Sequence, residues 1–350
     1  MPGRAKYQAM VAPIFSATLF YGKLHVITLP LRHAEDMLIT TGADVASQTR
    51  AYNQTLAETL AALPALHQID DPPAIRAARA RGDGPFPAPV RLEHGQDRLV
   101  PGRGGDVPVR VFVPPVVRGV HLHIHGGGWT LGSAADQDPQ LWRLATAAEI
   151  AVVSVDYRLS PEHPYPAAPD DCEDAARWLI AQAPREFGTG RLTIGGESAG
   201  AHLSVVTLLR LGAQARTFRA AQLTFGAYDL SMTPSQRQWG PRNLILSTPI
   251  MRWFYDRFLP GTDLEGRRDP DISPLYADLT GLPPARFVIG TEDPLLDDSL
   301  FMAARWRAAG NETTLEVIAE AAHAFLNFPL EISERELGRQ EEYLAKAIAD

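Results

Sequence analysis

A serine inside a glycine-rich pentapeptide is the first feature of this sequence that could do chemistry. Gly196-Glu197-Ser198-Ala199-Gly200 follows a short β-like run and precedes a helix-like one. A serine at such a strand-to-helix turn exposes its Oγ at the carboxyl end of a sheet, and glycines on both sides let the backbone turn sharply. The pattern predicts that Ser198 is a nucleophile. An ordinary glycine-rich turn, such as a phosphate cradle, is the alternative.

A second glycine-rich segment, residues 125–129 (HGGGW), follows the apolar run 120–124. Attack on a carbonyl group creates an oxyanion that needs N–H donors already in place, and glycine backbones approach it without side-chain obstruction. We assign the three donors to the amides of Gly126, Gly127 and Ala199. A glycine-rich hairpin without this role is the alternative.

A serine hydroxyl attacks only when a base removes its proton and a carboxylate orients that base. At turns of this kind the acid and then the histidine follow the serine along the chain. His323 is the only histidine beyond the helix that follows Ser198, and it comes directly after a predicted strand. Asp293 follows the predicted strand 285–289, so we assign it as the acid. Asp297 is the rival, and we expect it to cap or support the next helix.

Three histidines share one face of the predicted strand before the glycine loop. His121, His123 and His125 alternate along the chain, so their imidazoles could converge on a metal ion. No acidic or cysteine partner is near them in the sequence, and we expect no metal site. We expect His202, one turn after Ser198, to serve in packing or hydrogen bonding.

The elements that must position these residues alternate between strands and helices. This alternation predicts an α/β protein with a mainly parallel sheet covered on both faces. An insertion over about residues 231–274, rich in aromatic residues and proline, interrupts the alternation and should lie above the sheet. We expect strands at 107–113, 120–124, 151–155, 191–195, 220–225, 285–289 and 314–318, and helices at 45–66, 74–81, 136–148, 170–181, 199–211, 296–309 and 332–348.

Composition narrows the class of protein. The chain has 350 residues, 45% of them hydrophobic and 21% charged, which is enough apolar content for a sizeable core. A net charge of -8 without a basic cluster argues against a nucleic-acid partner. Cys172 is the only cysteine, which excludes an intramolecular disulfide and a cysteine-based zinc site.

The first residues leave the location of the protein open. Arg4 and Lys6 precede an apolar stretch, 9–21, as in a signal peptide, but Pro13 interrupts the stretch and it is too short to span a bilayer as a helix. We expect a cytoplasmic protein without stable membrane insertion. Export or peripheral membrane association through residues 1–30 is the alternative.

The motifs together resemble the hormone-sensitive-lipase-like branch of the α/β-hydrolases, a bacterial family of short-chain esterases. The resemblance covers the chain from about Tyr52 to the C-terminus. It departs from the family pattern at Glu197, where this branch more often has aspartate. The residues that carry it are 125–129 (HGGGW), 156–167 (DYRLSPEHPYPA), 196–200 (GESAG), 293–295 (DPL) and His323.

This resemblance implies an α/β-hydrolase fold with a mixed, mostly parallel, eight-stranded sheet flanked by helices. It implies a helical cap built from residues 45–85 and the insertion 231–274 on a catalytic domain, 86–350, while residues 1–44 are an extension of unknown role. It further implies hydrolysis of short-to-medium acyl esters of small molecules through an acyl-enzyme, without a cofactor. Dimerisation through the last strand and helix stays open.

Substrate specificity depends on residues that these motifs do not contain. We expect Trp129, Tyr157, Trp253 and Phe254 to wall an apolar acyl pocket, and a core role is equally compatible with each of them. A lipase, a specialised deacetylase and a non-catalytic ligand-binding relative are the competing functions, because a fold alone does not determine chemistry.

Overall fold

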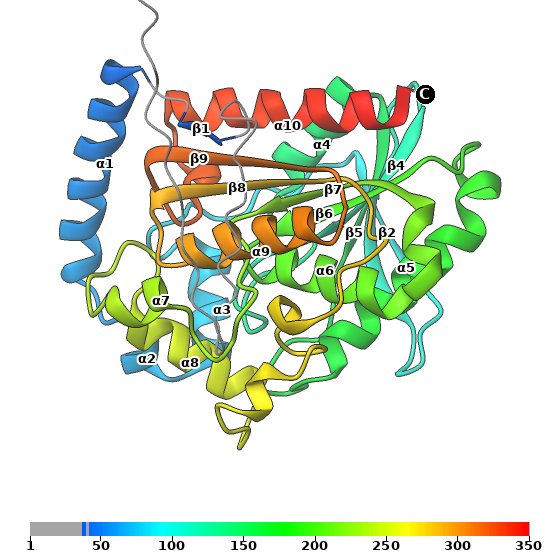
Figure 1. Ribbon diagram of the computed structural model, residues 1–350. Helices are drawn as coiled ribbons and strands as arrows, with labels where there is room; N and C mark the ends of the chain where they lie inside the picture. The colour runs from blue at the N-terminus through cyan, green and yellow to red at the C-terminus, as the bar shows by residue number, and fades with distance from the viewer. Residues whose placement is uncertain (1–36, 40–41, 350) are drawn as a thin grey trace, which may run out of the picture.

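A single mixed sheet forms the centre of the molecule in the computed structural model, which describes residues 37–39 and 42–349 (Figure 1). The strand order is β1-β9-β8-β7-β6-β4-β5-β3-β2, with antiparallel pairs only at β2/β3 and β3/β5. The strands are β1 (Met37–Ile39), β2 (Gly95–Val100), β3 (Val107–Phe112), β4 (Gly119–Ile124), β5 (Ile150–Val155), β6 (Leu192–Glu197), β7 (Phe218–Thr224), β8 (Ala285–Glu292) and β9 (Thr313–Ala322).

The expected eight-stranded sheet is confirmed by β2 to β9, and β1 adds a ninth strand. β1 pairs in parallel with β9, with Met37 opposite Leu315. Of the predicted extension 1–44, residues 1–36 and 40–41 lie outside the described residues. The extension therefore contributes one short strand to the outer edge of the sheet.

Helices cover both faces of this sheet. α4 and α10 pack together on one face, while α5, α6 and α9 cover the other. Every residue of β4, β5 and β6 is buried, as expected for central strands with both faces covered. The helices are α1 (Ala43–Ala61), α2 (Leu66–Ile69), α3 (Pro72–Arg81), α4 (Asp138–Ala148), α5 (Ala167–Glu186), α6 (Ala199–Leu211), α7 (Pro234–Gln238), α8 (Thr248–Phe258), α9 (Leu296–Ala308) and α10 (Glu331–Ala349).

The first predicted helix ends a few residues earlier than expected, and a separate short helix follows it. α1 ends at Ala61 and α2 begins at Leu66, with Pro64 between them. Proline has no N–H for a helical hydrogen bond and disfavours the helical conformation of the residue before it, which accounts for the break.

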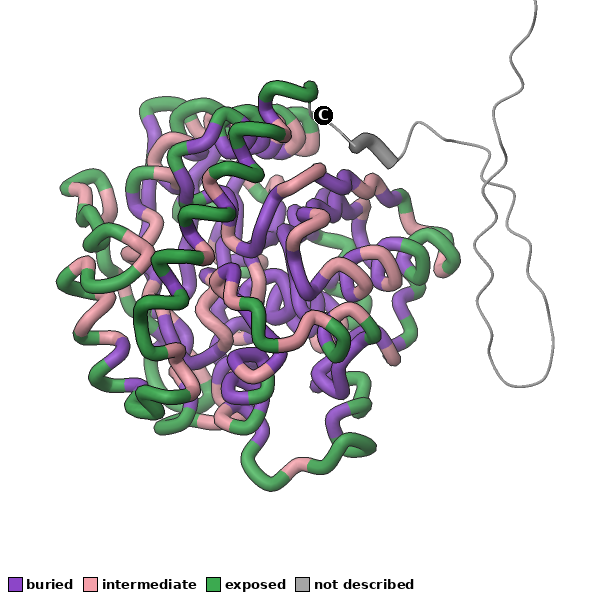
Figure 2. The backbone as a smooth tube through the Cα atoms, turned by 90° about the vertical axis from the view of Figure 1, so that its left-hand side faces the viewer, coloured by how far each residue is buried: buried purple, intermediate pink, exposed green. Residues whose placement is uncertain are grey.

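The N-terminal helices and the insertion 231–274 lie on the same side of the sheet. Figure 1 shows α2, α3, α7 and α8 together below the strands, while α1 stands upright at the left, beside the end of β9. α2 contacts α8, and Arg76 of α3 donates hydrogen bonds to the carbonyls of Thr130 and Ser160. Figure 2 shows the buried strands enclosed by helices whose outer surfaces are exposed. Both segments therefore adjoin the loops that follow the central strands.

Candidate active site

Ser198 occupies a sharp turn between β6 and α6. Its backbone has φ 55° and ψ −119°, a conformation that non-glycine residues rarely adopt and that surrounding structure must enforce. The Ser198 amide donates a 2.9 Å hydrogen bond to the carbonyl of Thr224 on the neighbouring strand β7. A Cβ atom at Gly200 would collide with the carbonyl of Ile124 on β4, so this turn requires glycine. The result is a serine side chain held at the carboxyl edge of the sheet.

A continuous chain of hydrogen-bonding groups joins Ser198, His323 and Asp293. Nε2 of His323 lies 3.0 Å from Oγ of Ser198, and Nδ1 lies 2.8 Å from Oδ2 of Asp293. An ionised carboxylate only accepts hydrogen bonds, so Nδ1 carries the proton and Nε2 is free to accept one from the serine. His323 and Asp293 are both buried, whereas Ser198 remains accessible from the cavity described below. This arrangement has the geometry of a nucleophile, a base and an orienting acid.

The loop after β8 distinguishes the two candidate aspartates. The other carboxylate oxygen of Asp293 accepts a 2.9 Å hydrogen bond from the amide of Leu295, which fixes its orientation toward His323. Asp297 lies in the first turn of α9 and accepts a hydrogen bond from the amide of Ser235, at 2.8 Å. Asp297 thus connects α9 to the insertion, in the supporting role expected from its position.

The glycine loop after β4 lies directly against the serine turn. A Cβ atom on Gly126 would be 2.8 Å from the carbonyl oxygen of Glu197 and 3.4 Å from Cβ of Ser198. Gly127 has φ 119°, a conformation that favours glycine. Ala199, the remaining predicted donor, is the first residue of α6. The helix N-terminus and the glycine loop therefore both adjoin Oγ of Ser198, where an oxyanion would form.

Each of the three histidines in or directly after β4 has its own polar partner. Nδ1 of His121 lies 3.0 Å from the Thr193 hydroxyl, and Nδ1 of His125 lies 2.7 Å from the Gly126 carbonyl. Burial lowers the pKa of His121 to about 3. Within residues 37–39 and 42–349, no group of three histidine, cysteine or acidic side chains is placed to hold a metal ion.

His123 supports the nucleophile turn in a way that the sequence alone did not reveal. Its Nε2 lies 3.2 Å from the carboxylate of Glu197, the residue before the nucleophile, and its Nδ1 lies 2.9 Å from the Ser154 hydroxyl. The register of β4 and β6 places His123 opposite Gly195, so the pairing arises between strands that are far apart in the sequence. Glu197 is therefore tied to the strand that leads into the glycine loop.

Comparison with known proteins identifies the family of the chain. A family model described as the alpha/beta hydrolase fold matches residues 121–327, more than half of the chain. The chain belongs to the α/β-hydrolase family. Its hormone-sensitive-lipase-like branch is indicated by a crystal structure titled as a hormone-sensitive lipase from a metagenome library, with a TM-score of 0.72 and 27% identity over 86% of this chain and 98% of that one.

Two further similarities are to esterases. The chain is 36% identical over 242 residues to a carboxylic ester hydrolase, LipN, of Mycobacterium tuberculosis, an alignment that covers 66% of this chain and 64% of LipN. An esterase structure from the archaeon Pyrobaculum calidifontis has a TM-score of 0.76 and 29% identity, and covers 85% of this chain and 98% of that chain. The chain thus spans somewhat less than two thirds of LipN and nearly all of the archaeal enzyme.

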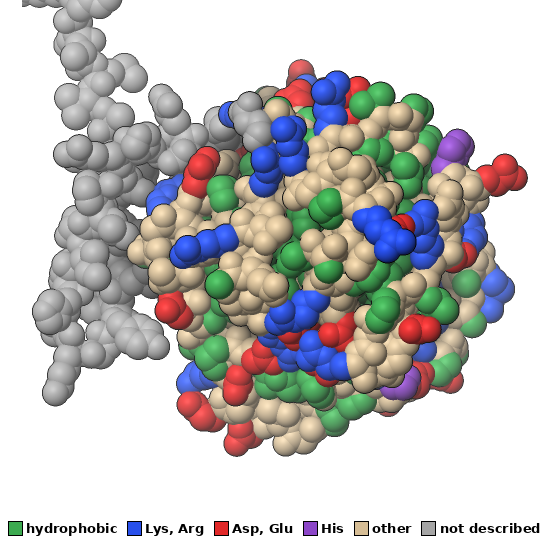
Figure 3. Space-filling model, turned by 90° about the vertical axis from the view of Figure 1, so that its right-hand side faces the viewer, with side chains coloured by type: hydrophobic (Ala, Val, Ile, Leu, Met, Phe, Trp, Pro, Cys, Tyr) green, Lys and Arg blue, Asp and Glu red, His purple; other side chains and the backbone are tan. Residues whose placement is uncertain are grey.

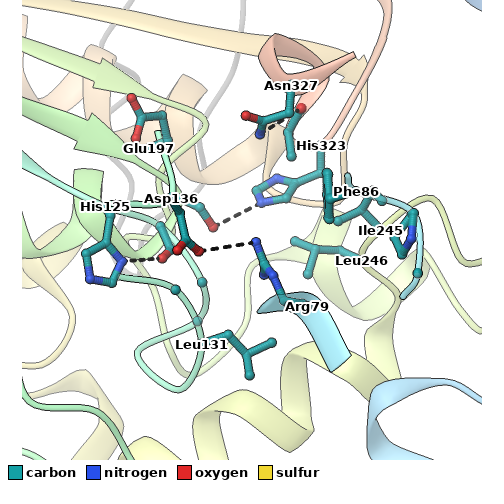
Figure 4. Close-up of a pocket in the computed structure, with 18 of the residues that line it drawn as sticks. Arg79, Phe86, His125, Leu131, Asp136, Glu197, Ile245, Leu246, His323 and Asn327 are labelled. Carbon is teal, nitrogen blue, oxygen red and sulfur yellow. Dashed lines mark hydrogen bonds and ion pairs between the residues drawn. The ribbon is translucent and has the colours of Figure 1, made fainter. Parts of the chain in front are cut away.

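In this α/β-hydrolase a cavity of about 1020 Å³ opens above the serine turn. Ser198, His323 and the glycine loop line the floor of the cavity, and the N-terminal helices and the insertion supply its walls. Figure 4 shows His323 pointing into the cavity from one side and Leu131 and Leu246 from the other sides. Sites for drug-sized ligands range from roughly 300 to 1,000 Å³, so the cavity is larger than a short ester requires.

Two of the four predicted pocket residues line this cavity. Trp129 and Phe254 contribute to its wall. Tyr157 instead stacks on His125 and donates a 2.9 Å hydrogen bond to the His125 carbonyl, beneath the glycine loop. Trp253 is not among the residues that line the cavity, and its Nε1 donates to Asp70 of the N-terminal segment. The structure therefore corrects the pocket assignment of Tyr157 and Trp253, since both hold loops in place outside the cavity.

His202 has the hydrogen-bonding role expected of it. Trp129 donates from Nε1 to Nδ1 of His202 at 3.1 Å, and Nε2 of His202 lies 2.8 Å from the Ile272 carbonyl. Nδ1 is thereby an acceptor and Nε2 a donor, and burial lowers the pKa of His202 to about 4. A neutral histidine thus links the glycine loop to the insertion.

Proposed function

We propose that this protein is a serine carboxylesterase that hydrolyses short-to-medium acyl esters of small molecules through an acyl-enzyme. The observation that carries this proposal is the hydrogen-bonded chain from Ser198 through His323 to Asp293 at the base of a large cavity. The esterase names of its relatives support the same conclusion.

The geometry supports a two-stage mechanism. As Oγ of Ser198 attacks the ester carbonyl, its proton passes to Nε2 of His323, while Asp293 orients the ring and stabilises the imidazolium. The tetrahedral oxyanion is stabilised by the amides of Gly126, Gly127 and Ala199. Collapse breaks the ester bond, and the alcohol leaves with the proton from His323. Water then attacks the acyl-enzyme with His323 again as base, which releases the acid and restores the serine.

The remaining assignments follow from this one. We assign residues 45–85 and 231–274 to a cap that closes the cavity over the catalytic domain 86–350. Acidic and basic side chains are intermixed on the face in Figure 3, which fits a small-molecule substrate better than a nucleic acid.

Location and assembly are also proposals. No helix in the described part of the chain has both the length and the apolar character needed to cross a membrane. We assign the protein to the cytoplasm because its one cysteine, Cys172, is free and buried, so the fold requires no disulfide. A homodimer joined through β9 and α10 would form only if β1 left the outer edge of β9, because β1 occupies that edge.

The test is the initial rate of hydrolysis of p-nitrophenyl esters of increasing acyl length, by the wild type and by Ser198→Ala. We expect activity on short and medium chains that falls by about 10⁴-fold or more in the variant, because alanine has no hydroxyl with which to form the acyl-enzyme. Full activity in a folded Ser198→Ala protein would contradict the assignment of the nucleophile. Inactivity of the folded wild type on every chain length would favour a specialised acyl substrate or a binding function.

A further inference from the structure

Two arginines line the cavity, and their surroundings differ. The guanidinium of Arg143 is bound by Glu334 at 2.5 Å and Glu341 at 2.6 Å. Arg79, on α3, has its nearest carboxylate oxygen, from Asp136, at 4.0 Å, which is beyond hydrogen-bonding distance. Among the described residues, no side chain or carbonyl accepts a hydrogen bond from Arg79. Its donors therefore line the cavity without a hydrogen-bond acceptor from the described residues, and Asp136 is only a long-range ion-pair partner.

Such a guanidinium is expensive unless a ligand or water satisfies it. Arginine carries five N–H donors, and burying donors without acceptors costs free energy. The other arginines of the described chain without an acceptor, Arg185, Arg216 and Arg252, are exposed to solvent. Only 34% of the Arg79 side chain is accessible, and burial lowers the pKa of its guanidinium. The position of Arg79 thus suits a group that meets an acceptor brought by the substrate.

The side chain is held in a defined place. Arg79 extends from α3 over the ring of Phe86, with its guanidinium carbon 5.2 Å from the ring centre. Figure 4 shows it pointing toward Asp136, in the space between Leu131 and Leu246. Asp136 is fixed in turn by the Ser133 hydroxyl, which donates to it at 2.6 Å. Donor and acceptor are therefore both held in the wall of the reaction cavity.

We propose that Arg79 and Asp136 form a polar subsite that binds a hydroxyl group of the ester substrate. A hydroxyl oxygen can lie about 2.8 Å from both groups across a 4.0 Å gap, accepting from Arg79 and donating to Asp136. The enzyme then prefers esters whose alcohol or acyl part carries a hydroxyl group. This inference rests on the proposed esterase function and specifies its substrate class.

A substrate carboxylate fits the same place less well. It would lie beside the carboxylate of Asp136 and could only accept hydrogen bonds, so repulsion would offset its attraction to Arg79. Three further carboxylates, those of Asp83, Glu197 and Glu334, also line the cavity, whereas Arg143 is already neutralised. The charges of the cavity therefore favour an uncharged donor and acceptor over an anion.

The rest of the cavity adds an apolar requirement. Its wall on the N-terminal side includes five large aliphatic side chains, so a substrate that fills it combines a hydrocarbon part with a hydroxyl-bearing part. These side chains are Leu60, Leu63, Leu66, Ile69 and Ile75.

Matched esters that differ only in methyl and hydroxyl groups test the proposal. On the alcohol side the pair is propyl butanoate and 2-hydroxyethyl butanoate, and on the acyl side p-nitrophenyl 3-methylbutanoate and p-nitrophenyl 3-hydroxybutanoate. For at least one pair we expect the wild type to favour the hydroxyl ester by about tenfold in kcat/KM, as for one well-placed hydrogen bond. Arg79→Met and Asp136→Ala should each bring this ratio close to that of the other pair, and Arg143→Met is the matched control that should leave it unchanged.

The outcomes separate this inference from the esterase proposal. A wild type that hydrolyses all four esters without a hydroxyl preference, or a preference that survives in both Arg79→Met and Asp136→Ala, would overturn the subsite and leave the esterase function standing. A stronger preference for carboxymethyl butanoate that is lost in Arg79→Met would replace the hydroxyl site by an anion site. Loss of every activity in the wild type would contradict the esterase function itself. Thermal unfolding of each variant, with Arg79→Gln as a second substitution, shows that the compared proteins are folded.

Discussion

The floor of the cavity, which contains Ser198, Asp293 and His323, and the walls of the cavity are built in different ways. Ser198, Asp293 and His323 each lie at or just beyond the carboxyl end of a parallel strand, β6, β8 and β9. The walls come from α1 to α3 and from the insertion, which meet only through tertiary contacts such as that of Trp253 with Asp70. The adjacency of strand ends thus determines the chemistry, while packing between distant segments determines what fits above it. Substitutions at the cavity floor should therefore alter the rate for all esters, and substitutions in the walls should alter the preference among esters.

The largest effect in this comparison is expected from neutralising Asp293, the acid at the cavity floor. Asp293→Asn should lower kcat by about 10⁴-fold for all esters, because an amide no longer holds the His323 tautomer in which Nε2 accepts the serine proton. Asp297→Asn is the matched control, since Asp297 bonds to Ser235 and does not contact His323. Steady-state kinetics on p-nitrophenyl acetate and octanoate measure both variants. Equal losses in the two would contradict the assignment of Asp293.

A smaller loss, still independent of the ester, is expected in the glycine loop. Gly126→Ala places a Cβ atom 2.8 Å from the Glu197 carbonyl, so the loop must move away from Ser198 and its amides lose their alignment with the oxyanion. Removing one oxyanion donor costs roughly 10²–10³-fold in kcat, and we expect a loss of this size on short and long chains alike. Gly281→Ala, at a glycine far from the cavity lining, controls for general loss of stability. If Gly126→Ala lost activity only on long chains, this loop would act in substrate selection, as the walls do, and not in catalysis at the cavity floor.

Much of the cavity floor could be predicted from the sequence, because short motifs define it. α6 begins and ends at the predicted residues, Ala199 and Leu211, since the serine turn precedes it and Gly212 follows it. The predicted acid and base come directly after predicted strands, and the topology of a parallel sheet then brings strand ends together. β2 was not predicted because its burial alternates weakly, and its pairing with β3 defines it.

The walls could not be predicted to the same depth. α8 lies in a segment treated as an insertion without assigned elements, although Ser247, which caps the amide of Ile250, and the proline after Thr248 are helix-start signals. Trp253 and Phe254 are neighbours on α8 and point to different surroundings, a distinction that depends on how the helix is rotated against α2. The Arg79–Asp136 pair joins α3 to the loop before α4, and no local pattern connects the two.

His202 lies where the cavity floor meets the walls, and it should make the stability of the fold there sensitive to low pH. Its folded-state pKa of about 4 lies below the value of about 6.5 in the unfolded chain, so the unfolded state binds the extra proton. Stability from the neutral ring is complete above about pH 6.5 and is lost as the pH falls toward 4, by about 1.4 kcal/mol per pH unit. His202→Gln should reduce the slope of unfolding free energy against pH by this amount.

Urea unfolding at pH 7, 6 and 5 measures that slope. His121, whose pKa is also lowered by burial, contributes its own slope in both proteins, so only the difference between them reports on His202. His163→Gln, at an exposed histidine, is the matched control and should have the wild-type slope. Identical slopes in wild type and His202→Gln would show that His202 is not neutral in the folded protein, or that its pKa is not lowered.

The smallest effect is expected where two wall segments meet, at Asp70. Its carboxylate accepts a 3.0 Å hydrogen bond from Trp253 and is paired with Arg257, which joins the segment after α2 to α8. Asp70→Asn removes the charge, keeps an acceptor for Trp253 and tolerates the left-handed backbone at φ 54°. Exposed ion pairs contribute only about 0.2–1 kcal/mol, so KM for the octanoate ester should rise about two- to threefold while kcat for the acetate ester stays the same. Asp278→Asn, at an exposed aspartate away from the cavity lining, should change neither value. A fall in kcat for acetate in Asp70→Asn would mean that the walls and the cavity floor are coupled. The walls would then affect the chemical step as well as the choice of substrate.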